Sequence, residues 1–210
     1  MGRATGVRMR KLSLLFALVI TATGFASAQL VSVGALGGVR LTDGFRYEDE
    51  SRPYVVGGSV EVHLPARFAI EADALYQRVG NSTTFFSFNG DASATYFNHV
   101  RGNSWQFPLY VKYYFRPHTA AWQPFIGTGY AFRSVSFHED SSAFGSNLLP
   151  NGTFRFDFRS SLGIGASVVA GMRFHYGRIA FLPQVRYTRW SDTSDSINKN
   201  EATLLLGVTF

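Results

Sequence analysis

The sequence has no cysteine, which excludes disulfide scaffolds, thiolate metal sites, iron–sulfur clusters and cysteine nucleophiles. Charged residues are also scarce, at 16% of the chain against roughly 25% in typical soluble domains. No segment after residue 28 stays apolar for about 18 residues, so the sequence predicts no transmembrane helix. The fold therefore has to be inferred from shorter patterns.

The net charge of +6 comes mostly from the N-terminus. Arg3, Arg8, Arg10 and Lys11 supply four of the 20 basic residues, and residues 1–28 contain no Asp or Glu. The rest of the chain has 16 basic and 14 acidic residues and is nearly neutral. We therefore expect no nucleic-acid partner, because nucleic-acid-binding domains carry clustered positive charge.

Residues 1–28 have the parts of a secretory signal peptide. A basic stretch is followed by an apolar run from Leu12 to Ile20 and by the Ala-Ser-Ala pattern of a signal-peptidase site at 26–28. The apolar run is shorter than the about 20 residues needed to span a bilayer, and the alternative interpretation is a buried N-terminal helix. We expect export, cleavage after Ala28, and one mature domain over residues 29–210.

Apolar and polar residues alternate along the mature chain, which is the period of a β-strand. Eight strands are expected, at residues 30–41, 56–64, 68–77, 104–116, 124–137, 167–176, 179–188 and 202–210. Polar composition predicts long loops at 42–53, 81–103, 139–152 and 191–201, and short turns at 65–67, 117–123 and Gly177. Because long loops alternate with short turns, all the long loops fall at one end of an up-and-down barrel, as in outer-membrane barrels.

The alternation alone does not decide which face lies inside, since a soluble ligand-binding barrel and a membrane barrel have opposite orientations. The polar face has few charges, of mixed sign, and many glycines, unlike a sheet that faces water. Aromatic residues on the apolar face lie near the strand ends, where headgroup girdles form: Tyr113, Phe115, Phe174 and Tyr176 at one rim, Tyr54, Tyr76, Trp105 and Tyr187 at the other. We therefore expect an all-β, eight-stranded antiparallel up-and-down transmembrane barrel with its polar face inward.

Several segments resemble strands of the bacterial outer-membrane β-barrel domain family, of the eight-stranded OmpA/OmpX kind. They are Trp-Gln-Phe-Pro-Leu-Tyr-Val-Lys-Tyr-Tyr-Phe at 105–115, Gln-Pro-Phe-Ile-Gly-Thr-Gly at 123–129 and Pro-Gln-Val-Arg-Tyr-Thr-Arg-Trp at 183–190. The C-terminal pattern is similar to the signal read by the barrel-assembly machinery of Gram-negative envelopes, and its residues are Leu204, Leu206, Val208 and Phe210. The resemblance implies a cell outer membrane protein, in contact with outer-membrane lipid and lipopolysaccharide. We expect a monomer without the peptidoglycan-binding domain of many OmpA-type proteins, because the chain ends with the barrel.

The inner face carries charges of both signs: Glu61, Glu71 and Asp73 against Lys112, Arg173 and Arg186. Counted from the short turns, Glu61, Lys112 and Arg173 lie roughly 13 Å up their strands, and Asp73 lies at a similar level. The interior of an eight-stranded barrel is just wide enough for its own side chains, so a general porin is not expected. We predict a lumenal salt-bridge layer that either neutralises and fills the core or gates protons or ions.

Two small enzymes of this barrel size, a lipid A deacylase and a palmitoyl transferase, make catalysis an alternative. The deacylase pattern needs a His two residues before a Ser, and none of the five His residues has one. His138, Glu139, Asp140 and Ser141 are adjacent and could mimic a transferase or metal site, but neighbours on one loop seldom converge on one point. We expect no catalytic residue, no cofactor and no metal.

Aromatic residues also gather in two predicted external segments: Phe85, Phe86, Phe88, Tyr96, Phe97, Phe154, Phe156 and Phe158. The strict alternation of 154–159 predicts that the sixth strand extends beyond the membrane. These aromatics either bind a surface ligand or pack the loops against each other or against lipopolysaccharide. The sequence favours a non-enzymatic barrel with a structural or surface-interaction role, including adhesion. A narrow ion or solute conduit and a lipid-modifying enzyme are the alternatives.

Overall fold

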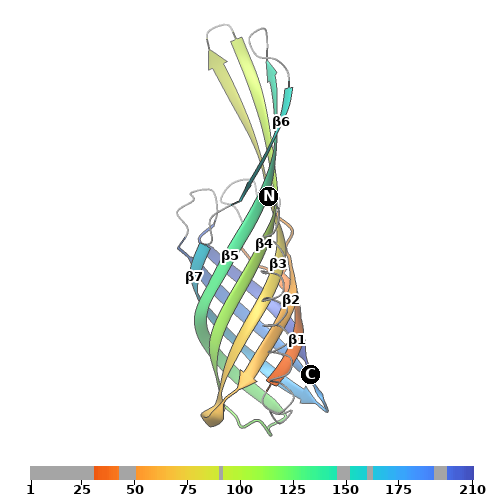
Figure 1. Cartoon of the computed structure of the whole chain (residues 1–210), viewed down its shortest axis with the longest axis vertical. Coiled ribbons are helices and arrows are strands. Elements are labelled where there is room, and N and C mark those ends of the chain that lie inside the picture. Colours follow the sequence, from red (N-terminus) through yellow and green to blue (C-terminus); the bar gives the residue numbers. More distant parts are fainter. Residues whose placement is uncertain (1–30, 43–50, 90–91, 146–151, 160–162, 192–197) are drawn as a thin grey trace, which may run out of the picture.

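The computed structural model describes residues 31–42, 51–89, 92–145, 152–159, 163–191 and 198–210. They form antiparallel strands that close into a tall barrel, and one short 3-10 turn, η1, at Pro65–Arg67 (Figure 1). The strands are β1 Val31–Arg40, β2 Tyr54–His63, β3 Phe68–Asn89, β4 Ala92–Tyr114, β5 Trp122–Gly145, β6 Gly152–Arg159, β7 Gly163–Tyr176, β8 Ile179–Trp190 and β9 Asn200–Thr209. Within the described ranges, no helix is long and apolar enough to cross a membrane.

Eight of these strands form the closed ring, which confirms the predicted barrel. The order is β1-β2-β3-β4-β5-β7-β8-β9, and β9 pairs back onto β1. The remaining strand, β6, pairs with β5 beyond the ring. β5 pairs with β7 as far as Arg133 and with β6 from Ser136 onward. Beside β5, β6 therefore takes the place outside the barrel that β7 takes within it. The alternation at 154–159 predicts this extension.

The prediction of polar loops at 81–103 and 139–152 is wrong for most of each segment. β3 runs to Asn89, β4 starts at Ala92, and β5 runs to Gly145. The residues there are polar, but a strand that leaves the membrane has water to solvate its polar side chains, and the aromatic residues on β3 and β4 favour strand. Strand β9 likewise begins at Asn200, inside the loop predicted at 191–201, while the loop predicted at 42–53 lies mostly outside the described residues.

The barrel places apolar side chains outward and polar ones inward. On β4, the outward Leu109 and Val111 are 48% and 50% exposed, whereas the inward Tyr110 and Lys112 are 1% and 0% exposed. A band of exposed Val, Leu, Ile and Phe around a polar interior is unfavourable in water and favourable in lipid. The predicted orientation is confirmed.

Aromatic side chains contact one another at both ends of this outward apolar band. At the short-turn end, the rings of Phe68 and Tyr113 lie 5.2 Å apart, and those of Tyr113 and Phe115 lie 5.4 Å apart. At the opposite end, the rings of Tyr76 and Trp105 lie 5.3 Å apart. These contacts mark the two headgroup levels, because amphipathic rings favour the membrane interface.

Candidate functional site

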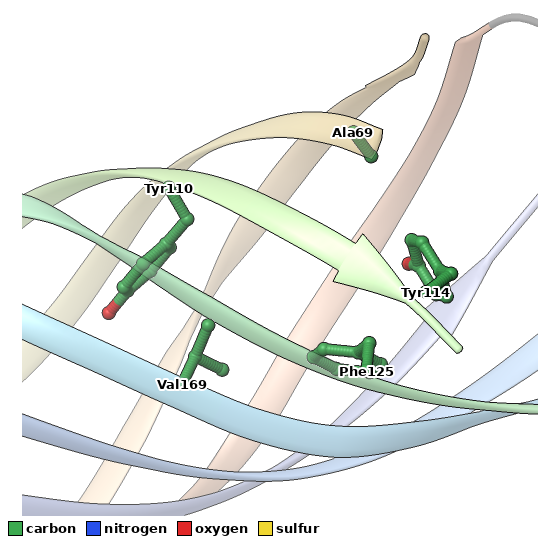
Figure 2. Close-up of a cluster of buried hydrophobic side chains, with 5 residues drawn as sticks. All are labelled: Ala69, Tyr110, Tyr114, Phe125 and Val169. Carbon is green, nitrogen blue, oxygen red and sulfur yellow. The ribbon is translucent and has the colours of Figure 1, made fainter. Parts of the chain in front are cut away.

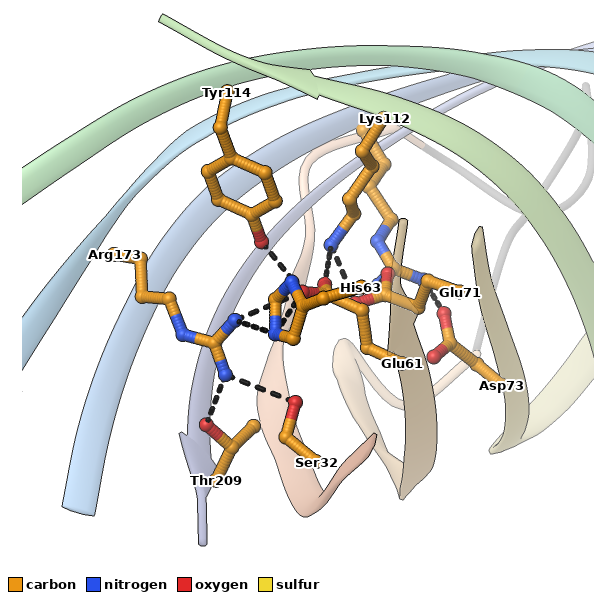
Figure 3. Close-up of polar contacts among 10 residues, drawn as sticks. Ser32, Glu61, His63, Glu71, Asp73, Lys112, Tyr114, Arg173 and Thr209 are labelled. Carbon is orange, nitrogen blue, oxygen red and sulfur yellow. Dashed lines mark hydrogen bonds and ion pairs between the residues drawn. The ribbon is translucent and has the colours of Figure 1, made fainter. Parts of the chain in front are cut away.

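Six buried charges form one continuous network across the lumen, near the short turns (Figure 3). Arg173 Nη1 lies 2.8 Å from Glu61 Oε1. Lys112 Nζ lies 3.1 Å from the other oxygen of Glu61, Oε2, and also contacts Glu71. Arg186 then joins two carboxylates, with Nη2 3.1 Å from Glu71 Oε1 and Nη1 2.6 Å from Asp73 Oδ2. Three positive and three negative charges therefore alternate along the chain of contacts.

Neutral groups add hydrogen bonds at the Arg173 end of this network. Tyr114 donates a hydrogen bond of 2.7 Å from its hydroxyl to Glu61. Arg173 donates to Ser32 Oγ at 2.9 Å and to Thr209 Oγ1 at 3.1 Å. All six charged side chains are at least 94% buried, so each carries a large desolvation cost that only complete pairing can offset. The network is thus built so that each charge has a partner of opposite sign.

Three side-chain contacts span the full width of the barrel. In the eight-stranded ring, the opposite strand pairs include β2 with β7, β3 with β8, and β4 with β9. Glu61 and Arg173 join the first pair, and Asp73 and Arg186 join the second. Gln106 Nε2, on β4, donates to Glu201 Oε1, on β9, at 2.8 Å. Side chains from facing walls therefore meet in the middle of the lumen, as expected for a barrel of this size.

A second polar cluster lies nearer the long-loop end. Glu201 accepts hydrogen bonds from Gln106 and from Trp190 Nε1, the latter at 3.0 Å. The guanidinium of Arg133 lies 4.3 Å above the Trp190 ring. Sequence analysis missed Glu201 because it falls in a predicted loop. Had the predicted last strand started at residue 200, as β9 does, Glu201 would have fallen on the same face as the inward Leu205.

A buried apolar group lies beside the charge network and extends towards the short turns (Figure 2). Its members are Ala69, Tyr110, Tyr114, Phe125 and Val169. Lys112 Nζ lies 4.4 Å above the Phe125 ring, and a Cβ on Gly127 would come within 2.9 Å of Lys112 Cγ. Glycine at 127 therefore leaves room for the lysine.

The sequence-predicted charges thus meet, although not all in the expected pairs. Glu61, Glu71, Asp73, Lys112 and Arg186 join Arg173 in the single network. Arg173 contacts Glu61 as expected from their levels. Asp73, expected at the same level, instead contacts Arg186, at the other end of the network. The strands are strongly tilted in the barrel, so residue counts from the turns do not translate directly into contacts.

Beyond the barrel, β3, β4, β5 and β6 continue as a four-stranded sheet, seen rising above the ring in Figure 1. We call this part the external sheet: residues 80–89, 92–101, 136–145 and 152–159. Its inner face, continuous with the lumen, becomes apolar at a cluster formed by Val79, Val100, Val135 and Phe137. Its outer face, continuous with the lipid-facing wall, becomes polar at Arg101 and His138, which pair across β4 and β5. At this level, next to the barrel, the polarity of the two faces is therefore inverted, whereas further out aromatic and polar residues occur on both faces, with Phe97 outward and Asn98 inward.

Several predicted contact residues lie on the external sheet. Phe85, Phe86 and Phe97 are 57%, 69% and 47% exposed, and Tyr96 is half-buried opposite Phe85. Phe88, Phe154, Phe156 and Phe158 lie on β3 and β6, but their side chains are outside the described part of the structure.

The residues 138–141 do not converge on one point. They lie on β5, where His138 and Asp140 project to one face and Glu139 and Ser141 to the other. In the described part of the chain, no three His, Asp or Glu side chains are grouped closely enough to hold a metal ion.

The C-terminal strand closes the barrel. β9 pairs with both β8 and β1, and Phe210 exchanges backbone hydrogen bonds with Val33. Leu204 and Leu206 are 45% and 52% exposed on the lipid-facing side, Val208 is half-buried, and Phe210 is 72% exposed.

The family model for the outer membrane protein beta-barrel domain matches residues 12–210. Among solved structures, the N-terminal β-barrel domain of OprF from Pseudomonas aeruginosa is similar at 14% identity and a TM-score of 0.47, covering 87% of this chain and 98% of that chain. Neisserial surface protein A is similar at 13% identity and a TM-score of 0.44, covering 87% of this chain and 96% of that chain. Ail from Yersinia pestis, in complex with the heparin analogue sucrose octasulfate, is similar at 12% identity and a TM-score of 0.39, covering 86% and 95%. No curated protein matches the chain closely enough to count as a relative.

Proposed function

Because this chain belongs to the outer membrane protein β-barrel domain family, we propose that it is a non-enzymatic barrel that presents the external sheet to a surface partner. One observation carries the proposal: three strands continue past the membrane-facing barrel and form, with β6, a sheet that is not closed. A barrel that served only to fill the membrane would gain nothing from this extension.

The edges of the external sheet supply the means of binding. From Ser82 to Asn89, the strand pairing of β3 in the described structure is with β4 alone, and β6 pairs there with β5 alone. A sheet edge of this kind offers a row of backbone N–H and C=O groups to which an extended segment can add as a further strand. We therefore expect the partner to contribute a β-strand.

Exposed aromatic side chains supply the second element of the proposed interface. Phe85 is directly opposite Tyr96, and Phe97 lies on the reverse face of the same hairpin. Aromatic residues dominate the binding energy of many interfaces because each buries a large area on contact. Pockets between them would select the side chains of the added strand.

The proposal is tested by binding to panels of surface proteins and glycans, with the mature chain in lipid nanodiscs. A truncated variant joins Asn81 to Val100 and Phe137 to Phe158 by short turns, which removes most of the external sheet and retains the whole ring. We expect every specific partner of the full-length protein to be lost in the truncated variant. Equal binding by the two proteins would contradict the proposal.

A narrow ion conduit is the second candidate, and the alternating charge network favours it. Glu61 and Glu71 each contact two cations, so either carboxylate could release one cation while it keeps the other. Planar-bilayer conductance of the wild type and of Glu71→Gln tests this candidate. Conductance that changes with this substitution would support a conduit, whereas no conductance in either protein would exclude it.

A lipid-modifying enzyme is the third candidate. His63 lies 3.3 Å from Glu61, inside the lumen and away from the lipid-facing surface where a lipid substrate would bind. Mass spectrometry of lipid A from a deletion strain tests this candidate, and an altered acylation pattern would revive it.

Targeting and assembly complete the proposal. Export with cleavage after Ala28 delivers the mature chain, and the barrel-assembly machinery recognises the C-terminal strand through Leu204, Leu206, Val208 and Phe210. The lipid-facing positions of these side chains support this assignment, because they are accessible before the strand is sealed into the membrane. The finished barrel is a monomer surrounded by outer-membrane lipid and lipopolysaccharide.

A further inference from the structure

The short-turn end of the barrel carries exposed arginines without acidic side chains. Arg67, Arg116 and Arg178 lie in its three connections, and all three are exposed. No Asp or Glu occurs at residues 62–70, 113–123 or 174–180. The neighbouring charge network inside the barrel contains equal numbers of positive and negative groups, so it does not neutralise these arginines.

Two of these arginines are anchored near the end of β4. Arg67 Nη1 donates a hydrogen bond of 3.2 Å to the carbonyl oxygen of Phe115, the residue before Arg116. The Arg116 guanidinium lies 3.9 Å above the ring of Trp122. Neither guanidinium has a carboxylate partner within the described residues. Two cations are thus anchored near the end of β4 without a counter-ion from the described part of the chain.

The backbone around Arg67 is unusual in a way that supports a specific role. Ala66 and Arg67 have φ angles of 62° and 69°, in the left-handed region that non-glycine residues seldom occupy. Two such residues in succession cost free energy, and this turn directs Arg67 towards the end of β4. A glycine-containing turn, like the one at Gly177 between β7 and β8, would connect the strands with less strain.

The pair lies at the edge of the lipid-facing aromatic band. Tyr113, Phe115 and Trp122 are the outward aromatic residues beside it, and their rings lie at the headgroup level. We propose that Arg67 and Arg116 bind the phosphodiester of an anionic phospholipid in the leaflet around the short turns. The planar guanidinium fork matches phosphate oxygens in a bidentate manner, and the acyl chains would lie along the three aromatic rings.

The surroundings favour a lipid headgroup over a free anion. A soluble phosphate would gain only the two exposed charges, which salt screens strongly. A phospholipid is held at the correct depth by its own acyl chains, so its phosphate is already concentrated at the height of Arg67 and Arg116. The adjoining apolar rings would be covered only by a ligand that has acyl chains.

Trp122 gives a direct measurement of which lipid lies beside the pair. The mature chain carrying Trp105→Phe is folded into phosphatidylcholine vesicles that contain a trace of spin-labelled phosphatidylglycerol or spin-labelled phosphatidylcholine. The substitution removes Trp105, which also faces lipid. The remaining tryptophan besides Trp122 is Trp190, which is 2% exposed and lies inside the lumen, out of reach of the labelled lipids. At low salt, we expect quenching of Trp122 to show enrichment of phosphatidylglycerol of about fivefold for each arginine at the membrane surface.

Matched variants separate charge from structure. Arg67→Gln with Arg116→Gln should abolish the enrichment, whereas Arg67→Lys with Arg116→Lys should retain most of it. Arg101→Gln with Arg189→Gln removes two exposed arginines from the opposite end and should leave it unchanged. If the double glutamine variant does not fold, Arg116→Gln alone should still reduce the enrichment severalfold.

Three results would overturn the proposal. One is equal quenching by the two labelled lipids in the wild type, and another is enrichment that survives in the glutamine variant. The third is loss of enrichment when inorganic phosphate replaces chloride at equal ionic strength, which would identify a free anion as the ligand.

Discussion

The same three strands, β3, β4 and β5, serve both the barrel and the external sheet, and their side-chain polarity inverts at the boundary where they pass from one to the other. Within the barrel, outward Leu109 is about half exposed and inward Lys112 is fully buried. Beyond the barrel, outward Arg101 is exposed and inward Phe137 is 5% exposed. The alternation continues through the boundary in phase, so only the chemistry of the two faces changes.

The inversion shows that the solvent determines what each face must be. In lipid, the outer wall has no water to solvate polar groups, and the interior is left for hydrogen-bonded charges. In water, apolar side chains gain from packing against each other on the sheltered face, as Val79, Val100, Val135 and Phe137 do. On β4, the outward side chains change from apolar to charged between Trp105 and Arg101, and this change therefore locates the outer limit of the membrane.

The largest expected effect comes from placing a charge on the outer face of the barrel and, for comparison, on the outer face of the external sheet. Leu109→Arg, in the barrel, should reduce the free energy of unfolding by roughly 2–4 kcal/mol, because the charge faces acyl chains. Phe97→Arg lies on the same face of the same strand but in water, and should change it by less than about 0.5 kcal/mol. Urea unfolding from lipid vesicles measures both. Equal costs for the two substitutions would show that the lipid boundary has been misplaced.

Removing a lumenal charge should have the next largest effect. Arg173→Met leaves Glu61 with Lys112, Tyr114 and His63 as neighbours, so the loss should be roughly 1–3 kcal/mol rather than the full cost of an unpaired buried charge. Glu61→Gln in the same protein should restore part of this loss, since the uncompensated carboxylate disappears. The same unfolding measurement compares the single and double variants. Simple addition of the two single effects would contradict a shared network.

A smaller effect, on assembly rather than stability, is expected at the end of the chain. Deleting Phe210 removes an exposed ring and its two backbone hydrogen bonds to Val33 where β9 closes on β1. The variant should be exported normally but should enter the outer membrane more slowly. Pulse-chase labelling of the folded form measures the rate, and export of the precursor is the control. Insertion at the wild-type rate would show that Phe210 is not part of the assembly signal.

The sequence was sufficient for the ring because period two is a strong signal wherever one face meets lipid. For the same reason, the sequence predicts which charged residues face inward, and three of them, Glu61, Lys112 and Arg173, lie in one network. Their individual partners could not be predicted. The diametric contacts depend on strand tilt and register, which no local pattern encodes.

The external sheet was harder to predict, because composition and periodicity disagree there. Segments 81–103 and 139–152 are polar, which is typical of loops, yet most of their residues lie in strands. The missed Glu201 has the same origin, since a polar residue near a predicted loop was not assigned to the strand that follows. Strict alternation, as at 154–159, is thus a better guide than composition once a strand leaves the membrane, because polar residues no longer indicate its end there.

The smallest expected change in stability belongs to the residues that the proposed function needs most. Phe85→Ser with Phe97→Ser removes two rings that are 57% and 47% exposed, so the free energy of unfolding should change by less than about 0.5 kcal/mol for each. Binding of a surface partner should nevertheless fall, because exposed rings contribute their area only when the partner covers them. Phe107→Ser is the matched control: it has similar exposure, at 45%, but lies on the lipid-facing wall, where it should reduce stability without affecting the partner. Unfolding and partner binding, measured on the same preparations, separate the two roles. If the double serine variant unfolds much more easily and binds as before, the aromatics of the external sheet serve packing rather than recognition.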